Sequence, residues 1–167
     1  MNITTLQKYL LTCLLLIIPA MAFNVVFTKR LPPAYQVDVF WKDIPGWLGT
    51  GENLFRTMVF ILPVLMPLNI KTPGQRAGLG LFLFGTLVYF LAWIVLMFNP
   101  NGAWSTSPFG FMAPAYTPLL WLVGIGMIGD SLFFNVPYTP WIYIVLVAVF
   151  LCFHNTHAWI VYARIYR

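Results

Sequence analysis

The chain has 167 residues, of which 60% are hydrophobic and only 8% are charged. Too few polar side chains remain to cover a water-soluble globule of this size, so the composition predicts an integral membrane protein. The net charge of +5 comes from residues scattered beside apolar runs, which favours contact with anionic lipid headgroups and argues against binding to nucleic acid.

Five apolar stretches, each about long enough to cross a bilayer, fill most of the chain. They are expected to be helices, because a backbone in hydrocarbon must satisfy its own hydrogen bonds and the stretches lack the polar and apolar alternation of a barrel. The predicted spans are residues 9–27, 54–70, 78–98, 116–134 and 141–162. Residues 1–167 are therefore expected to form one compact all-α domain, a polytopic bundle of about five transmembrane helices, in the cytoplasmic (inner) membrane if the source is bacterial.

The first stretch also fits a secretory signal peptide. Lys8 precedes an apolar run, and residues 20–22 (Ala-Met-Ala) are small enough at the right places for a cleavage site. Apolar residues continue to Phe27, however, and give the length of a full span. We expect a retained helix, with a bundle of four spans as the alternative if the segment is removed.

Residues 31–53 form the longest connection and are expected to lie in the membrane interface. Apolar and aromatic residues recur there at helical spacing, at Val37, Phe40, Trp41 and Ile44. This spacing favours a short interfacial helix. The same segment also alternates like a strand, and a run this short does not distinguish the two structures.

The fourth stretch, residues 116–134, is the weakest span, because Gly124, Gly126, Gly129 and Asp130 all reduce its tendency to insert. It is predicted either to cross the bilayer or to form a re-entrant helix, in which case the bundle has four spans. With five crossings, three Lys and Arg residues flank one side of the membrane and six flank the other. That count favours a C-terminus in the cytoplasm, whereas the short turn with Lys71 and Arg76 is typical of a cytoplasmic hairpin, so the orientation stays open.

Glu52, Asn53 and Arg56 open the second span and are candidate ligand-binding residues. Polar groups at apolar spans are expensive to bury, which makes each a candidate functional group. Glu52 and Arg56 lie one helical turn apart with the acid on the N-terminal side, the favoured orientation for an ion pair. Glu52 is also a candidate catalytic acid. In a simpler interpretation, Glu52 complements the helix dipole and Arg56 reaches the lipid headgroups.

His154 and His157, near the end of the fifth span, form the second candidate cluster. Residues three apart share a helix face, so both imidazoles can point at one partner. They are candidates for ligand binding and for acid–base catalysis, while neutral histidines that pack between helices are the simpler interpretation. A metal pair would need at least one more ligand. The sequence therefore predicts no metal site and no cofactor.

Asp130, at the end of the fourth stretch, is a further candidate catalytic residue. It is the only acidic residue after Glu52. Its position before the turn to Pro137 also fits a carboxylate that caps the turn or is solvated at the interface. If the fourth helix crosses, Asp130 lies on the opposite face of the membrane from the other two clusters.

The five-span arrangement places the start of the second helix and the end of the fifth on the same side. Glu52, Arg56 and the two histidines would then occupy one layer. Residues 99–115, which include Trp104, are expected to form a loop that closes over that side, with Trp104 contributing to ligand binding. A carboxylate, a guanidinium and imidazoles beneath an aromatic lid would form the polar mouth of an apolar pocket.

The function expected from this arrangement is to bind or move an apolar or amphipathic small molecule, of the lipid or isoprenoid class, within the bundle. An alternative is a membrane-embedded acid–base enzyme of the isomerase or cyclase type, in which Glu52 or Asp130 is the acid and one of the two histidines is the base. A third interpretation is a non-catalytic subunit or assembly factor, which packs against a membrane-protein partner or a second copy of itself through the glycines of the fourth helix. The chain contains no Walker motif and no Gly-x-Ser-x-Gly elbow.

Overall fold

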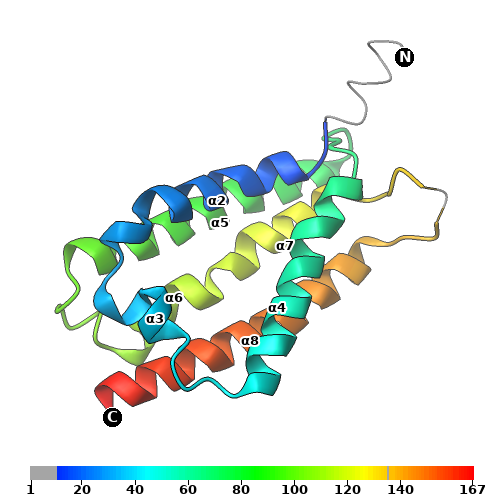
Figure 1. Cartoon of the computed structure of the whole chain (residues 1–167). Helices are drawn as coiled ribbons and strands as arrows, with labels where there is room; N and C mark the ends of the chain where they lie inside the picture. Colours follow the sequence, from blue (N-terminus) through cyan, green and yellow to red (C-terminus); the bar gives the residue numbers. More distant parts are fainter. Residues whose placement is uncertain (1–10, 135) are drawn as a thin grey trace.

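The computed structural model describes residues 11–134 and 136–167 (Figure 1). Within these ranges the regular secondary structure is helical, and the only β-type pairing is an isolated bridge between Thr12 and Pro67. Three segments are long and apolar enough to span a membrane: α5 (Pro73–Phe98), the segment formed by α6 (Pro108–Tyr116) and α7 (Pro118–Ile128), and α8 (Pro140–Tyr166). The expected class, a helical protein with segments suited to a membrane, is confirmed.

Two shorter helices correspond to the remaining predicted spans. Helix α2 (Leu14–Phe27) lies within the first, and α4 (Gly46–Ile61), extended by the 3-10 turn η3 (Leu62–Leu65), covers much of the second. They contain 14 and 16 residues, fewer than the roughly 20 that a bilayer crossing needs. Lys8, on which the signal-peptide alternative depends, lies outside the described residues.

Three short elements connect α2 to α4: the 3-10 turns η1 (Thr28–Arg30) and η2 (Pro33–Tyr35) and the helix α3 (Val37–Phe40). The predicted short helix is therefore present, although it has only four residues. The chain turns at Asp43, whose φ of 53° is left-handed, and α4 begins directly after Pro45. The connection between α2 and α4 is shorter than the predicted loop of residues 31–53, because α4 already begins at Gly46.

The fourth predicted span, residues 116–134, is displaced toward the N-terminus in the structure. Ser107 caps α6 by accepting a hydrogen bond of 3.1 Å from the Gly110 backbone N–H, and a proline occupies the first helical position. The span therefore runs over Pro108–Ile128. It takes in the second half of residues 99–115, which were expected to form a loop.

Helices α5 and α7 pack backbone to backbone. A Cβ atom built on Gly85 of α5 would lie 2.5 Å from the Trp121 backbone nitrogen, and one built on Gly124 of α7 would lie 2.6 Å from the Phe82 backbone nitrogen. No side chain fits at either position, so these glycines set the separation of the two helices. Residues 124–129 have the Gly-x-Gly-x-x-Gly spacing of nucleotide-binding turns, but they lie within α7 and its C-terminal cap and form no such turn.

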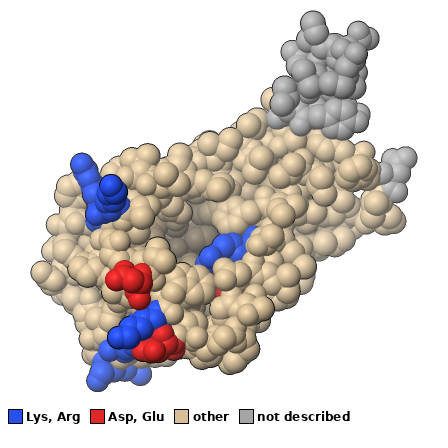
Figure 2. All heavy atoms as spheres, viewed as in Figure 1, with Lys and Arg blue, Asp and Glu red and all other residues tan. Residues whose placement is uncertain are grey.

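The helices run back and forth between the two ends of the molecule, with α2 beside α5 and with α4 crossing α8 (Figure 1). The main core is made by α2, α4, α5, α7 and α8, and includes Ile17, Val59, Phe82, Leu122 and Val147. Most charged side chains on the face in Figure 2 gather toward the end that carries the C-terminus. A hollow opens on the same face, and the candidate site lies in it.

Candidate functional site

Glu52, on α4, is the centre of a cluster of charged and polar side chains. Its side chain is fully buried, and both carboxylate oxygens have partners. Oε1 accepts a hydrogen bond from Arg56, one turn further along α4, and lies 2.9 Å from Nδ1 of His154. Oε2 lies 2.5 Å from Nδ1 of His157. The packing of α4 against α8 brings these partners together.

His157 shares a proton with Glu52. Its Nε2 atom lies 2.9 Å from the backbone carbonyl oxygen of Phe40, which can only accept, so Nε2 carries a proton. The contact between Nδ1 and Oε2 then needs a second proton, which belongs either to an imidazolium beside a carboxylate or to a carboxylic acid beside a neutral imidazole. In both cases, one proton is held between the two side chains.

This shared proton leaves the cluster with a positive charge. The proton balances the negative charge of Glu52. The positive charge of Arg56 then remains as the net charge of the cluster. The Arg56 side chain is one-third exposed, donates a second hydrogen bond of 3.2 Å to the amide oxygen of Asn53, and lies over the rings of Trp41 and Phe150. The side of the cluster that faces out of the protein is therefore cationic.

His154 is held by Glu52 with one ring nitrogen unoccupied. Its Nδ1 donates to Oε1 of Glu52, which accepts in either protonation state of the neighbouring pair. Its ring stacks on Phe150, with the centroids 5.5 Å apart and the planes 13° from parallel. Nε2 has no hydrogen-bond partner among the described residues, and 20% of the side chain is exposed. The imidazole is thus oriented, with a free nitrogen.

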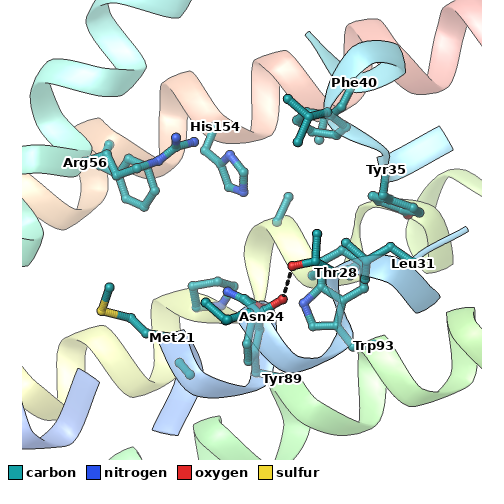
Figure 3. Close-up of a pocket in the computed structure, with 18 of the residues that line it drawn as sticks. Met21, Asn24, Thr28, Leu31, Tyr35, Phe40, Arg56, Tyr89, Trp93 and His154 are labelled. Carbon is teal, nitrogen blue, oxygen red and sulfur yellow. Dashed lines mark hydrogen bonds between the residues drawn. The ribbon is translucent and has the colours of Figure 1, made fainter. Parts of the chain in front are cut away.

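Arg56 and His154 form part of the wall of a cavity of about 470 Å³. Most of the cavity is apolar and aromatic, and Arg56 is the only Lys, Arg, Asp or Glu among the described residues that line it. Figure 3 shows Arg56 and His154 on one side of the cavity, with Met21 and Asn24 of α2 opposite them. The cavity therefore has a cationic side and an apolar body.

The wall opposite Arg56 contains a second set of polar groups. The Tyr89 hydroxyl of α5 donates to the Asn24 side-chain oxygen at 2.8 Å, and the Thr28 hydroxyl donates to the Asn24 backbone oxygen at 2.5 Å (Figure 3). Trp121 of α7 packs beside Tyr89, with ring centroids 6.1 Å apart. All four side chains line the cavity.

Helix α3 and η2 cover a third side of the cavity and are tied to the bundle through backbone carbonyls. Besides the bond from His157 to Phe40, Arg164 of α8 donates to the carbonyl oxygen of Val39 at 2.5 Å. The Tyr35 hydroxyl donates to the Phe111 carbonyl oxygen at 2.5 Å. Burial raises the pKa of Tyr35 well above its usual range, so the hydroxyl keeps its proton and remains a donor.

The structure brings together five of the seven candidate site residues. They are Glu52, Asn53, Arg56, His154 and His157.

The other two candidates lie elsewhere. Asp130 follows α7, is exposed and accepts a hydrogen bond of 2.9 Å from Gln75. Trp104 is half exposed and does not line the cavity. Part of the predicted loop forms α6, and α3 and η2 contribute to the cavity wall in the place expected for Trp104.

Sequence reasoning missed the polar wall formed by Asn24, Tyr89 and Trp121. Asn24 is a polar residue within the first apolar stretch, and this signal by itself marks a candidate functional group in a membrane segment. Tyr89 and Trp121 carry no comparable signal, since aromatic residues are frequent throughout the chain. The Phe40 carbonyl that fixes the state of His157 has no sequence signature.

Both histidines direct Nδ1 at the carboxylate of Glu52 rather than at a common point in the cavity. Among the described residues, no group of three or more His, Cys, Asp or Glu side chains is arranged to hold a metal ion. The site therefore offers charge, hydrogen bonds and apolar surface. Comparisons with protein-family models, with curated proteins and with solved structures give no match to this chain.

Proposed function

We propose that this chain is an integral membrane protein that binds an amphipathic small molecule of the lipid or isoprenoid class. The anionic head of the ligand lies against Arg56 and His154, and its apolar body fills the cavity. The observation that carries this proposal is a partly exposed guanidinium in the wall of an apolar cavity, whose carboxylate partner Glu52 is also engaged by two histidines.

The charge of the cluster selects an anion. A guanidinium has five donors in a planar fork, and Arg56 uses part of this set on Glu52 and Asn53. A carboxylate or phosphate could engage its remaining donors and supply the missing negative charge. His154 would donate or accept through Nε2 beside it. Such a head group would remove the cost of leaving a cation beside apolar surface.

The cavity suits the rest of such a molecule. Its volume of about 470 Å³ falls within the roughly 300–1,000 Å³ that small-ligand pockets occupy. Aromatic and aliphatic side chains make up most of its wall, including Phe60, Trp93, Leu122 and Phe150. Burial of an apolar tail against these side chains would supply most of the binding free energy.

We further propose that α2 and the α4–η3 segment also lie in the bilayer and complete five crossings. Both helices expose large apolar side chains, including Ile18 and Val25 on α2 and Met58 and Ile61 on α4. Exposed apolar surface of this extent on a membrane protein is suited to contact with lipid.

Labelling of single cysteines in sealed vesicles tests this topology. In a background without Cys13 and Cys152, Lys29→Cys and Lys71→Cys are expected to react from opposite sides of the membrane. Reaction of both from the same side would contradict a crossing by α4–η3.

The binding proposal is tested with palmitate and hexadecanol, which share a chain length and differ in head-group charge. Native mass spectrometry of the protein, released from gently solubilised membranes, measures the binding of each. We expect palmitate to bind more tightly, and Arg56→Gln to weaken palmitate binding about tenfold or more, because it removes a charge-assisted contact.

Arg76→Gln is the matched control, because Arg76 does not line the cavity. It is expected to leave palmitate binding unchanged. Equal binding of palmitate and hexadecanol would contradict an anion site. A protein that carries a stoichiometric partner chain and no small molecule would instead favour a role as a subunit.

The Glu52–His154 contact favours an acid–base enzyme as the second candidate function. A carboxylate that orients an imidazole, with Nε2 free at a cavity, is the arrangement of a general base. His154 would take a proton from one carbon of the ligand and return it to another, which is an isomerisation. Deuterium from D₂O would then enter the copurified molecule with wild-type protein but not with His154→Gln.

A further inference from the structure

Trp121 is a buried donor without a partner in the wall of the cavity. Its side chain is 4% exposed, and its indole N–H makes no hydrogen bond within the described part of the chain. A buried N–H group that has lost water and gained no acceptor is unfavourable, and such groups are rare in folded proteins. Trp121 is one of the residues that line the cavity.

The packing around Trp121 restricts its movement. Its backbone lies against Gly85 of α5 so closely that a Cβ atom there would be 2.5 Å from the Trp121 nitrogen. Its ring packs on Tyr89 at a tilt of 59°. The main chain of Trp121 is thus fixed against α5, and one face of its indole is covered by a neighbouring ring.

None of the hydroxyl and amide oxygens on this wall accepts a hydrogen bond from the Trp121 indole N–H. The side-chain oxygen of Asn24 already accepts from the Tyr89 hydroxyl, which leaves the Asn24 amide as a donor. The Thr28 hydroxyl donates to the Asn24 backbone oxygen. The indole N–H of Trp121 is therefore left without an acceptor among the described residues, and no charged residue lies on this wall. A neutral oxygen complements such a wall.

We propose that the cavity contains a second polar subsite, in which the Trp121 indole N–H donates to a neutral oxygen carried by the apolar body of the ligand. A carbonyl, ether or hydroxyl oxygen provides the required acceptor. The anionic head at Arg56 rests on the proposed function, whereas the oxygen at Trp121 is an independent feature. Together, the anion site and the Trp121 subsite restrict the ligand class from anionic lipids in general to those with an additional neutral oxygen, such as an oxo acid with a long apolar body.

Figure 3 shows why one molecule can reach both subsites. Arg56 and His154 lie on one side of the cavity, and Asn24 and Tyr89, beside which Trp121 packs, lie on the other. The apolar surface between the two walls would contact the hydrocarbon part of the ligand. A plain fatty acid would satisfy Arg56 and leave the indole without an acceptor.

Dihexyl ketone and tridecane test the subsite without an anionic head. They have the same carbon chain length and differ by one carbonyl oxygen. The full chain, with its tryptophans labelled with ¹⁵N, is placed in bilayer nanodiscs and titrated with each compound. Loss of one indole signal in Trp121→Phe identifies the Trp121 N–H resonance. We expect dihexyl ketone to move that resonance downfield and tridecane to leave its hydrogen-bonding state unchanged.

The same titrations give the preference for ketone over alkane. We expect the wild-type protein to prefer dihexyl ketone about fivefold, and Trp121→Phe to lose this preference while it keeps its affinity for tridecane. Trp159→Phe is the control, because Trp159 lies on α8, is partly exposed and does not line the cavity. It is expected to keep the preference.

If Trp121→Phe keeps the preference for dihexyl ketone over tridecane, the subsite is overturned. The indole N–H would then bind water or have no partner. Failure of both compounds to affect the Trp121 resonance at saturation would overturn it as well. The anion site is judged separately by palmitate and Arg56→Gln. A ketone response without Arg56-dependent palmitate binding would support the Trp121 subsite and contradict the anion site. Arg56-dependent palmitate binding without a ketone response would support the anion site and contradict the Trp121 subsite.

Discussion

His157 reaches from α8 to Glu52 and holds a proton between its Nδ1 atom and the Oε2 oxygen 2.5 Å away. Its other nitrogen donates to the carbonyl oxygen of Phe40 at 2.9 Å. One imidazole thus joins α3, α4 and α8. The two contacts of His157 therefore connect the Glu52 cluster to α3 in the cavity wall.

Glu52→Gln is expected to keep the fold, because a glutamine amide can satisfy the same contacts. Its oxygen accepts from Arg56 and His154, and its NH₂ group donates to Nδ1 of a neutral His157. The free energy of unfolding should change by about 1 kcal/mol or less. Glu52→Ala removes the acceptor that Arg56, His154 and His157 share and should cost about 3 kcal/mol or more.

Unfolding of both variants in the same detergent measures this difference. Asp130→Ala is the control, because it removes an exposed carboxylate and should cost less than about 1 kcal/mol. Equal losses for Glu52→Gln and Glu52→Ala would show that the hydrogen-bond network around Glu52 does not support the fold.

The shared proton is expected to be visible by NMR in protein with ¹⁵N-labelled histidine. A proton in the short contact between His157 and Glu52 should resonate far downfield of ordinary imidazole N–H groups. Glu52→Gln should remove this signal, because the proton then belongs to the amide. His154→Gln should retain it. A bare Nδ1 on His157 beside a wild-type Glu52 carboxylate would contradict the assignment.

The parts of the site that are local in sequence could be predicted. Glu52 and Arg56 are four residues apart on one helix, and His154 and His157 are three apart on another, so helical periodicity alone places each pair on one face. The helical class followed in the same way from long apolar runs. These features need no knowledge of which helices are neighbours.

The parts that depend on contacts between distant segments could not be predicted. No pattern in the sequence indicates that α4 packs against α8, yet that contact brings His157 to Glu52. The expected loop at residues 99–115 is shorter in the structure because an N-cap at Ser107 starts a helix inside it. Asn24 was detectable as a polar residue in an apolar run, but its pairing with Tyr89 was not.

Arg164→Gln is expected to loosen the α3 wall without disturbing Glu52. Arg164 donates to the carbonyl oxygens of Val39 and Lys42 and makes no contact with the carboxylate. Hydrogen exchange of the backbone amides in residues 37–42 should therefore rise several-fold, while the downfield signal of His157 is retained. Arg167→Gln, at the end of the chain, should leave that exchange unchanged. Unaltered protection in Arg164→Gln would show that His157 alone holds α3.

Gly85→Ala is expected to destabilise the bundle and weaken ligand binding, whereas Gly80→Ala on the same helix is expected to do neither. A methyl group at Gly85 would meet the Trp121 backbone at 2.5 Å, and nothing lies within 4 Å of one at Gly80. Alanine at the open position should be neutral or stabilising by about 0.5–1 kcal/mol, because it favours the helix. Alanine at Gly85 must push α7 away and move Trp121 in the cavity wall, at a cost of about 2 kcal/mol. Thermal unfolding and dihexyl ketone titration of both variants test this, and equal stability would show that α5 and α7 are not held together by glycine contacts.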